Sequence, residues 1–215
     1  MRSTFSNKNF LFILFFLLLI FFIGLSIEVA EGDIFSFDKK IFLWTHSIES
    51  NSLTTLALAC TFLGSQTFLL PANIILAGIF LFNYKHRAYA WKIALVSATS
   101  AGFLFLVKYI VKRPRPESPL LKAALHYSYP SGHTFTSITF IGILLYFALT
   151  YFKNVWGRAL IIFVSVIIIF SIGWSRVYLH VHYASDVLGG FCLGIMWLIL
   201  ASWFLINKKE NTTHL

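Results

Sequence analysis

Charged residues are scarce in this chain. Asp, Glu, Lys and Arg make up only 12% of the 215 residues, against 58% hydrophobic residues and a mean hydropathy of +0.79. Soluble domains carry roughly twice that share of charge, so the composition excludes a soluble globular fold and indicates a polytopic membrane protein. The chain has two cysteines, Cys60 and Cys192, in apolar surroundings without ligand spacing. A disulfide framework and a zinc–cysteine site are therefore excluded.

Acidic residues are the scarcest charged class. There are 8 Asp and Glu against 17 Lys and Arg, which gives a net charge of +9. Most of the acids lie in one connector, residues 28–52, and cannot form an obvious magnesium site elsewhere. No soluble basic face remains to bind nucleic acid, so the positive charge is first interpreted as loop charge beside a membrane.

Apolar runs predict six membrane-spanning helices and an all-α fold. The first run could belong to a cleaved signal peptide, but Glu28 stands where a cleavage site needs a small residue. We therefore expect an uncleaved first span. The runs are residues 10–27, a short piece 53–63 broken at Gly64-Ser65 and continued by 68–82, then 91–111, 133–151, 159–174 and 187–206.

The connector between the first two runs predicts an amphipathic helix. Phe37, Ile41, Trp44 and Ile48 recur at helical spacing, as in a helix that lies in the membrane interface. An ordinary surface helix packed on the loops remains the alternative. We expect one integral membrane domain, residues 1–215, with the first span and this helix in 1–52, a core in 53–206 and a tail in 207–215.

Positive charges indicate how the spans are oriented. With a cytoplasmic N-terminus, the N-terminal segment, the turns 85–87 and 153–158 and the C-terminal tail each carry at least two Lys or Arg. The loop 108–132 and the segment 176–186 then meet on the extracytoplasmic face. Extracytoplasmic loops usually carry few Lys and Arg, but the loop 108–132 is basic, so we infer that it binds an anion. A single loop that departs from this statistical rule is the alternative. Its basic residues are Lys108, Lys112, Arg113, Arg115 and Lys122.

The tetrapeptide Pro130-Ser131-Gly132-His133 predicts an anion site at a helix start. Ser131 is a natural N-cap, and the unpaired N–H groups of a helix N-terminus attract phosphate. Gly132 lets an anion approach the backbone, and His133 would stand beside it as a proton donor. A helix cap with an incidental histidine is the alternative.

The stretch 175–186 places ionisable groups between two apolar runs, where they are costly without a function. If Asp186 opens a helix, His182 lies four residues earlier, and the carboxylate can orient the imidazole as a nucleophile or base. A polar cluster at the membrane surface is the alternative. Lys108, Arg115 and Arg176 suit a phosphoryl group, whereas we expect Lys112, Arg113 and Lys122 to extend toward lipid head groups.

Three pieces then match in residue type, spacing and order. They are Lys108-x6-Arg115-Pro116, Pro130-Ser131-Gly132-His133 and Ser175-Arg176-x5-His182-x3-Asp186. Together they resemble the signature of the type 2 phosphatidic acid phosphatases, shared by vanadium haloperoxidases and some soluble acid phosphatases. The resemblance covers roughly residues 64–194. The short chain and compact loops resemble those of bacterial members of the family, which are phosphatidylglycerophosphatase B-like and undecaprenyl-diphosphatase-like.

The resemblance implies a role for each matching residue. His182 would attack phosphorus and form a phosphohistidine, Asp186 would orient it, and His133 would protonate the leaving oxygen and then activate water. The phosphate would be held by Lys108, Arg115, Ser131, Gly132 and Arg176. Such enzymes need no metal or other cofactor.

Two positions depart from the family pattern. Arg113-Pro114 precedes Arg115-Pro116 and competes for the phosphate role, although the spacing from Lys108 favours Arg115. His180 stands where the family often has glycine. We expect its side chain to face away from His182 and to make a secondary polar contact, with the substrate as a candidate partner.

The expected activity is hydrolysis of a lipid phosphate monoester or diphosphate in the cell membrane. Phosphatidylglycerophosphate, phosphatidic acid and undecaprenyl diphosphate are all candidate substrates. A phosphotransferase with the same site, passing phosphate to an alcohol, is the second reading. A lipid transporter without catalysis is the third. The sequence does not predict an oligomeric state.

Overall fold

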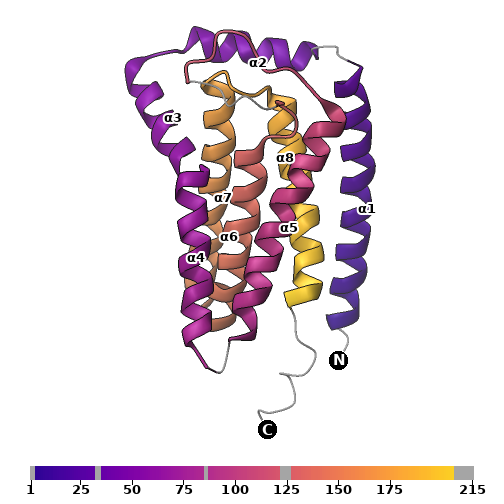
Figure 1. Cartoon of the computed structure of the whole chain (residues 1–215), viewed down its shortest axis with the longest axis vertical. Coiled ribbons are helices and arrows are strands. Elements are labelled where there is room, and N and C mark those ends of the chain that lie inside the picture. The colour runs from indigo at the N-terminus through magenta and orange to yellow at the C-terminus, as the bar shows by residue number, and fades with distance from the viewer. Residues whose placement is uncertain (1–2, 32–34, 85–86, 122–126, 206–215) are drawn as a thin grey trace.

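Eight α-helices form the described part of the chain, residues 3–31, 35–84, 87–121 and 127–205, in a computed structural model (Figure 1). The helices are α1 (Ser3–Ala30), α2 (Ser36–Ser47), α3 (Asn51–Leu63), α4 (Gln66–Phe82), α5 (Ala88–Val111), α6 (Gly132–Tyr151), α7 (Val155–Tyr178) and α8 (Ala184–Leu205). The prediction of an all-α membrane fold is confirmed.

Six stretches of the described chain are long and apolar enough to cross a membrane. Helices α1, α5, α6, α7 and α8 each supply one, and α3 and α4 together supply the sixth, Asn51–Phe82. Ser65 begins α4 because its hydroxyl accepts the Phe68 N–H. A Cβ on Gly64 would lie 2.6 Å from the Ile172 side chain. The junction of α3 and α4 therefore needs glycine to pack against α7.

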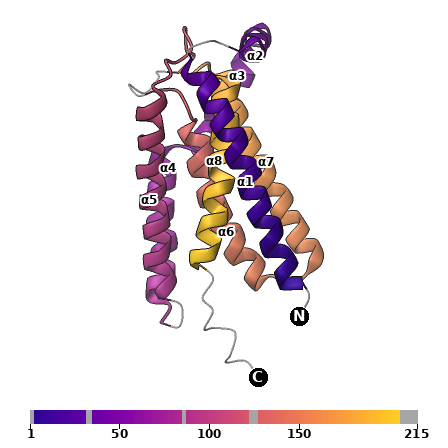
Figure 2. The ribbon, with the colours of Figure 1, turned by 90° about the vertical axis from the view of Figure 1, so that its right-hand side faces the viewer.

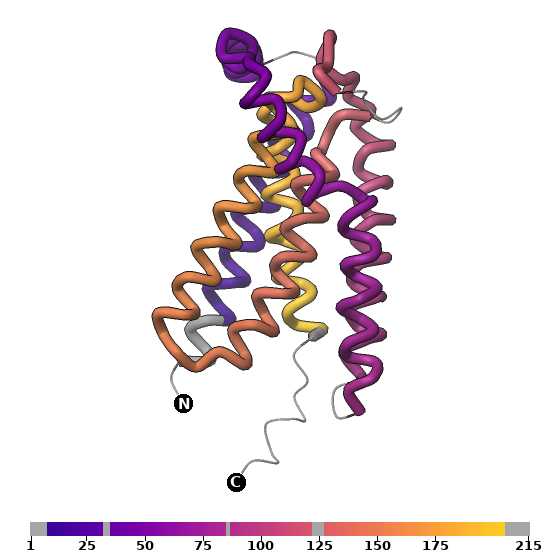
Figure 3. Tube along the Cα trace, turned by 90° about the vertical axis from the view of Figure 1, so that its left-hand side faces the viewer, coloured from indigo at the N-terminus to yellow at the C-terminus, as the bar shows by residue number. Residues whose placement is uncertain are grey.

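The spans are arranged with α6 and α8 in the middle. Helices α4 and α5 pack together on one flank, and α1 and α7 lie on the other (Figures 2 and 3). Close contact of α6 with α8 depends on small residues. A Cβ on Gly194 would lie 2.8 Å from Ile138, and one on Gly190 would lie 2.8 Å from the Ser131 carbonyl. The interpretation of these glycines as packing residues agrees with these distances.

Helix α2 lies across one end of the bundle (Figure 1). The helix expected in this connector is present, and two residues of its apolar stripe, Phe37 and Trp44, are 46% and 54% exposed rather than packed on the protein. The face that packs on the protein instead buries Asp38 and Thr45. The spacing of residues in the sequence predicts which side of α2 is apolar. Which side is buried depends instead on polar partners in distant segments of the chain.

Helix α1 begins and α8 ends at the opposite end of the bundle from α2 (Figure 1). The turn after α6 lies at that same end, so the expected grouping of the chain's segments into two ends agrees with the structure. Some of the charges used to predict the orientation lie outside the described residues, namely those of Lys85, Lys122 and the tail 207–215.

Candidate active site

A pocket of about 400 Å³ lies where α5 and α7 end and α6 begins. Its lining includes three cations and two histidines and no carboxylate. Six of the eight site residues predicted from sequence line it, and Ser131 and Asp186 lie behind it. The lining residues are Gly64, Ser65, Gln66, Thr67, Leu104, Phe105, Lys108, Arg115, Gly132, His133, Thr136, Arg176 and His182.

His182 follows α7 in the short turn that leads into α8. Its N–H and that of Val181 donate to the Arg176 carbonyl, both at 3.2 Å, which folds the turn back onto the helix end. Nδ1 lies 3.3 Å from Asp186 Oδ2, and Nε2 lies 3.3 Å from Arg115 Nη1. The predicted meeting of His182 and Asp186 is therefore present in the structure, with Nε2 on the pocket side.

The protonation state of His182 follows from its surroundings. Burial lowers the pKa of His182 to about 3, against the opposite effect of the Asp186 carboxylate. The imidazole is therefore neutral at pH 7. With Nδ1–H held by the carboxylate, Nε2 keeps a lone pair directed toward the pocket.

Asp186 lies in the first turn of α8 and is fully buried. Its Oδ2 accepts the Tyr183 N–H at 2.9 Å and the Ser128 hydroxyl. Its Oδ1 accepts Arg113 Nη1 at 2.6 Å. A carboxylate with this many donors is fixed in place, and it therefore holds the His182 ring in one orientation.

Three cationic side chains converge on the pocket from different elements. Lys108, in the last turn of α5, donates to the Tyr127 carbonyl at 2.7 Å and the Ser128 carbonyl at 3.1 Å. Arg115 Nη1 donates to the Val181 carbonyl at 2.7 Å. A site built in this way attracts a multiply charged anion.

Arg176, in the last turn of α7, is the third of these cations. It is 5% exposed and binds the Thr61 hydroxyl through Nη1. Its buried Nε has no protein partner. A buried donor without a partner is costly, and an anion bound in the pocket would satisfy it.

Ser131 and Gly132 form the start of α6 as expected. The Ser131 hydroxyl accepts the Thr134 N–H and hydroxyl at 3.5 and 3.1 Å, which caps the helix, and Ser131 is not among the residues that line the pocket, where it was expected to hold phosphate. A Cβ on Gly132 would lie 3.2 Å from Leu104. Gly132 and His133 line the pocket, so backbone and imidazole would both face an anion bound there.

Arg113 is not at the lipid surface, so the expectation that it extends toward head groups is wrong. It is 4% exposed, and Nη2 binds Asp38 Oδ2 at 2.8 Å while Nη1 binds Asp186 Oδ1 and the Ser185 hydroxyl. Burial disfavours its charge, but the two carboxylates outweigh this and raise the pKa of Arg113. Arg113 therefore supports Asp186, whereas Arg115, as its spacing predicted, lines the pocket.

Asp38 was not predicted as part of the site. Besides Arg113, it accepts the Ser185 N–H at 2.8 Å and the Ser185 hydroxyl at 2.5 Å. It thus ties α2 to the start of α8. The signal available in the sequence was the spacing of Asp38, Ile41, Phe42 and Thr45, which places a carboxylate on the same helical face as apolar residues.

Comparisons with known proteins agree with this geometry. The sequence model of the PAP2 superfamily matches residues 89–210. Phosphatidylglycerophosphatase B of Bacillus subtilis (strain 168) is 30% identical over 188 residues, which is 87% of this chain and 92% of that protein.

Solved structures also resemble this one. The crystal structure of a transmembrane PAP2 type phosphatidylglycerolphosphate phosphatase from Bacillus subtilis has a TM-score of 0.80 at 28% identity, covering 92% of this chain and 96% of that one. Aquifex aeolicus LpxE has a TM-score of 0.60 at 24% identity, covering 79% and 96%, and shares the fold.

Proposed function

The chain belongs to the PAP2 superfamily and is a phosphatase with several membrane spans, and from this we propose that it removes phosphate from a phosphorylated lipid. The observation that carries the proposal is the pocket in which His133 and His182 lie beside Lys108, Arg115 and Arg176. Two imidazoles among three cations suit transfer of an anionic phosphoryl group.

We propose a double displacement through a phosphohistidine. The lone pair on His182 Nε2 attacks phosphorus, and the bond to the lipid oxygen breaks as His133 gives that oxygen a proton. His133 then takes a proton from water, which attacks phosphorus and breaks the N–P bond. Asp186 stays ionised and orients His182 throughout. The negative charge of the bound phosphate favours the protonated form of His133 before the first step.

The cationic side chains would hold the phosphoryl oxygens during both steps. Lys108, Arg115 and Arg176 supply the positive charge, the start of α6 at Gly132 supplies space and backbone N–H groups, and Ser131 caps the helix that carries His133. The pocket lining contains no carboxylate, and Mg²⁺ requires several oxygen ligands. We therefore propose that the chemistry proceeds without a metal ion.

A second cavity favours a lipid substrate over a soluble one. It has about 500 Å³, lies between α4, α5 and α6, and shares Gln66 and Thr136 with the pocket. Its walls are mainly apolar, with Leu69, Ile74 and Phe140 among them. An acyl or prenyl chain whose phosphate occupies the pocket would fit there.

The pocket is proposed to face the extracytoplasmic side of the cell membrane, with both termini in the cytoplasm. The support is the distribution of Lys and Arg, since the turn 153–158 lies at the end of the bundle opposite α2 (Figure 1). The substrate head group would therefore be presented in the outer leaflet.

The proposed activity is tested with purified protein in EDTA. We expect release of inorganic phosphate from at least one of phosphatidylglycerophosphate, phosphatidic acid and undecaprenyl diphosphate. Adding an alcohol acceptor and analysing the products separates hydrolysis from phosphotransfer. Release from none of the three lipids, or release that stops in EDTA and returns with Mg²⁺, would contradict the proposal.

A larger side chain in the second cavity should lower activity toward lipid substrates selectively. Ala98→Phe would narrow the cavity between α4 and α5. We expect kcat/KM for the lipid to fall by about tenfold or more, with little change for p-nitrophenyl phosphate, which has no lipid tail. Ala159→Phe, at an exposed position on α7, is the control. Equal losses of kcat/KM with both substrates would contradict the assignment of this cavity to the lipid tail.

A further inference from the structure

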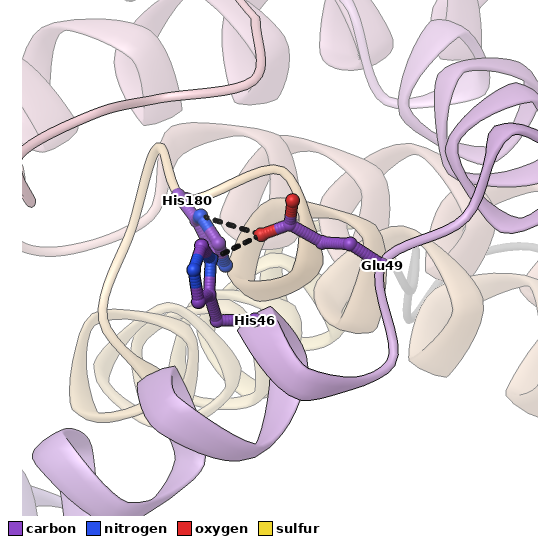
Figure 4. Close-up of side chains that lie close together, drawn as sticks. All are labelled: His46, Glu49 and His180. Carbon is purple, nitrogen blue, oxygen red and sulfur yellow. Dashed lines mark hydrogen bonds and ion pairs between the residues drawn. The ribbon is translucent and has the colours of Figure 1, made fainter.

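Three potential metal ligands meet at the α2 end of the bundle (Figure 4). His46 lies in the last turn of α2, Glu49 lies in the link to α3, and His180 lies in the turn between α7 and α8. His46 Nδ1 lies 2.6 Å and His180 Nδ1 3.7 Å from the same oxygen, Glu49 Oε1. None of the three lines the pocket that holds His182, so the cluster is separate from the proposed catalytic machinery.

The orientation of His180 is fixed by α2. Its side chain is almost fully buried, against the Phe42 ring at 4.4 Å between centroids, and Nε2 lies 3.2 Å from the Thr45 hydroxyl. That hydroxyl already donates to the Phe42 carbonyl at 2.9 Å, so it is placed to accept Nε2–H. With the proton on Nε2, the lone pair of Nδ1 lies on the side of Glu49, and the ring also hydrogen-bonds the Ser118 backbone. A histidine held in this way by its other nitrogen is typical of a metal ligand.

The backbone of His180 adds to this placement. Its φ of 55° lies in the left-handed region that favours glycine. A bulky side chain costs free energy there, yet this one is packed and hydrogen-bonded to α2. The expectation that His180 faces away from His182 and makes a secondary polar contact agrees with the structure, and the contact is to α2.

The three ligand atoms lie close to the spacing that a metal requires. All lie within 4.8 Å of one another. In a tetrahedral zinc site, with bonds of about 2.0–2.2 Å, neighbouring ligand atoms are roughly 3.3 Å apart. Small side-chain rotations would open the His46–Glu49 distance and close the His180–Glu49 distance to that value. The His46 side chain is 66% exposed, which leaves an entry path and room for a water as fourth ligand.

We propose that His46, Glu49 and His180 bind one Zn²⁺ ion at the surface of the protein. Two imidazoles and a carboxylate form a donor set that favours zinc, because magnesium and calcium bind mainly oxygen ligands. The ion would cross-link the end of α2 to the turn that carries His182 two residues further on. Its role is to hold this turn in place, and the proposed hydrolysis remains possible without it.

Metal binding is tested with protein that lacks a polyhistidine tag and has been stripped with EDTA. Co²⁺ serves as a spectroscopic probe, and Zn²⁺ is titrated by calorimetry. We expect one equivalent of either ion, a tetrahedral Co²⁺ spectrum that Zn²⁺ displaces, and a higher Tm with Zn²⁺ than without. Because these readouts do not use catalysis, failure of the phosphatase assay would leave this result unaffected.

Two exposed ligands provide variants that keep the fold. His46→Ala and Glu49→Gln are each expected to lose the Co²⁺ spectrum and the rise in Tm. Ser47→Ala is the control, because Ser47 is exposed on the same helix and its hydroxyl donates to the Trp44 carbonyl at 2.8 Å. Absence of binding by the unmodified chain, or binding that persists in both ligand variants, would overturn the proposal.

Discussion

Replacement of His182 by alanine is expected to abolish phosphate release, lowering kcat by about 10⁴-fold or more. Among the described residues that line the pocket, His182 is the one whose imidazole is held by a carboxylate. Nδ1 is held 3.3 Å from Asp186, and Nε2 lies beside Arg115 on the pocket side. Without that nitrogen the phosphoryl group has no nucleophile for the first step. The measurement is phosphate release from a lipid on which the unmodified protein is active.

Trapping the covalent intermediate makes this test specific. With a ³²P-labelled substrate, the unmodified protein quenched in alkali during turnover is expected to carry an alkali-stable label, because the phosphohistidine forms before water attacks. His182→Ala is expected to carry none. His46→Ala, assayed in metal-free protein, is the control for loss of an exposed histidine. Normal turnover by His182→Ala would contradict the mechanism, and lipid movement without any label would favour a transporter.

The catalytic pieces could be predicted from sequence because each is local. His182 and Asp186 meet at a separation of four residues, and Ser131 begins α6 one residue before its first helical position. The spans could be predicted because lipid requires long apolar helices. The fifth span was still underestimated, since α7 runs from Val155 to Tyr178 rather than 159–174. Polar residues at its end, including Arg176, continue the helix into the site.

The supporting residues could not be predicted because their partners are distant in the chain. Asp38 lies 75 residues from Arg113 and 147 from Ser185. No periodic pattern encodes such a pairing. An arginine at the end of a span is commonly found at the head groups, and only the position of α2 across the bundle shows that Arg113 is instead enclosed by carboxylates. The left-handed backbone at His180 likewise follows from the turn as a whole.

Asp38→Ala is expected to destabilise the protein by about 3–5 kcal/mol, because it removes one partner of a buried ion pair. Arg113 Nη2 would lose its 2.8 Å contact, and the Ser185 N–H would lose its acceptor. Both groups are buried, so water cannot readily replace the carboxylate. The free energy of unfolding in detergent measures the effect. Lys39→Ala, at an exposed position on the same helix, should change it by less than about 0.5 kcal/mol.

A double-mutant cycle decides whether this loss reflects the specific link between α2 and α8. Combining Asp38→Ala with Ser185→Ala should cost less than the sum of the single changes, with a coupling of about 1 kcal/mol or more. The same link leads through Arg113 to Asp186, so Asp38→Ala should also lower kcat while KM stays nearly constant. Additive single effects would show that Asp38 acts only as a generic buried charge. Stability equal to that of Lys39→Ala would refute the buried pair itself, since an uncompensated arginine cannot remain in that position without cost.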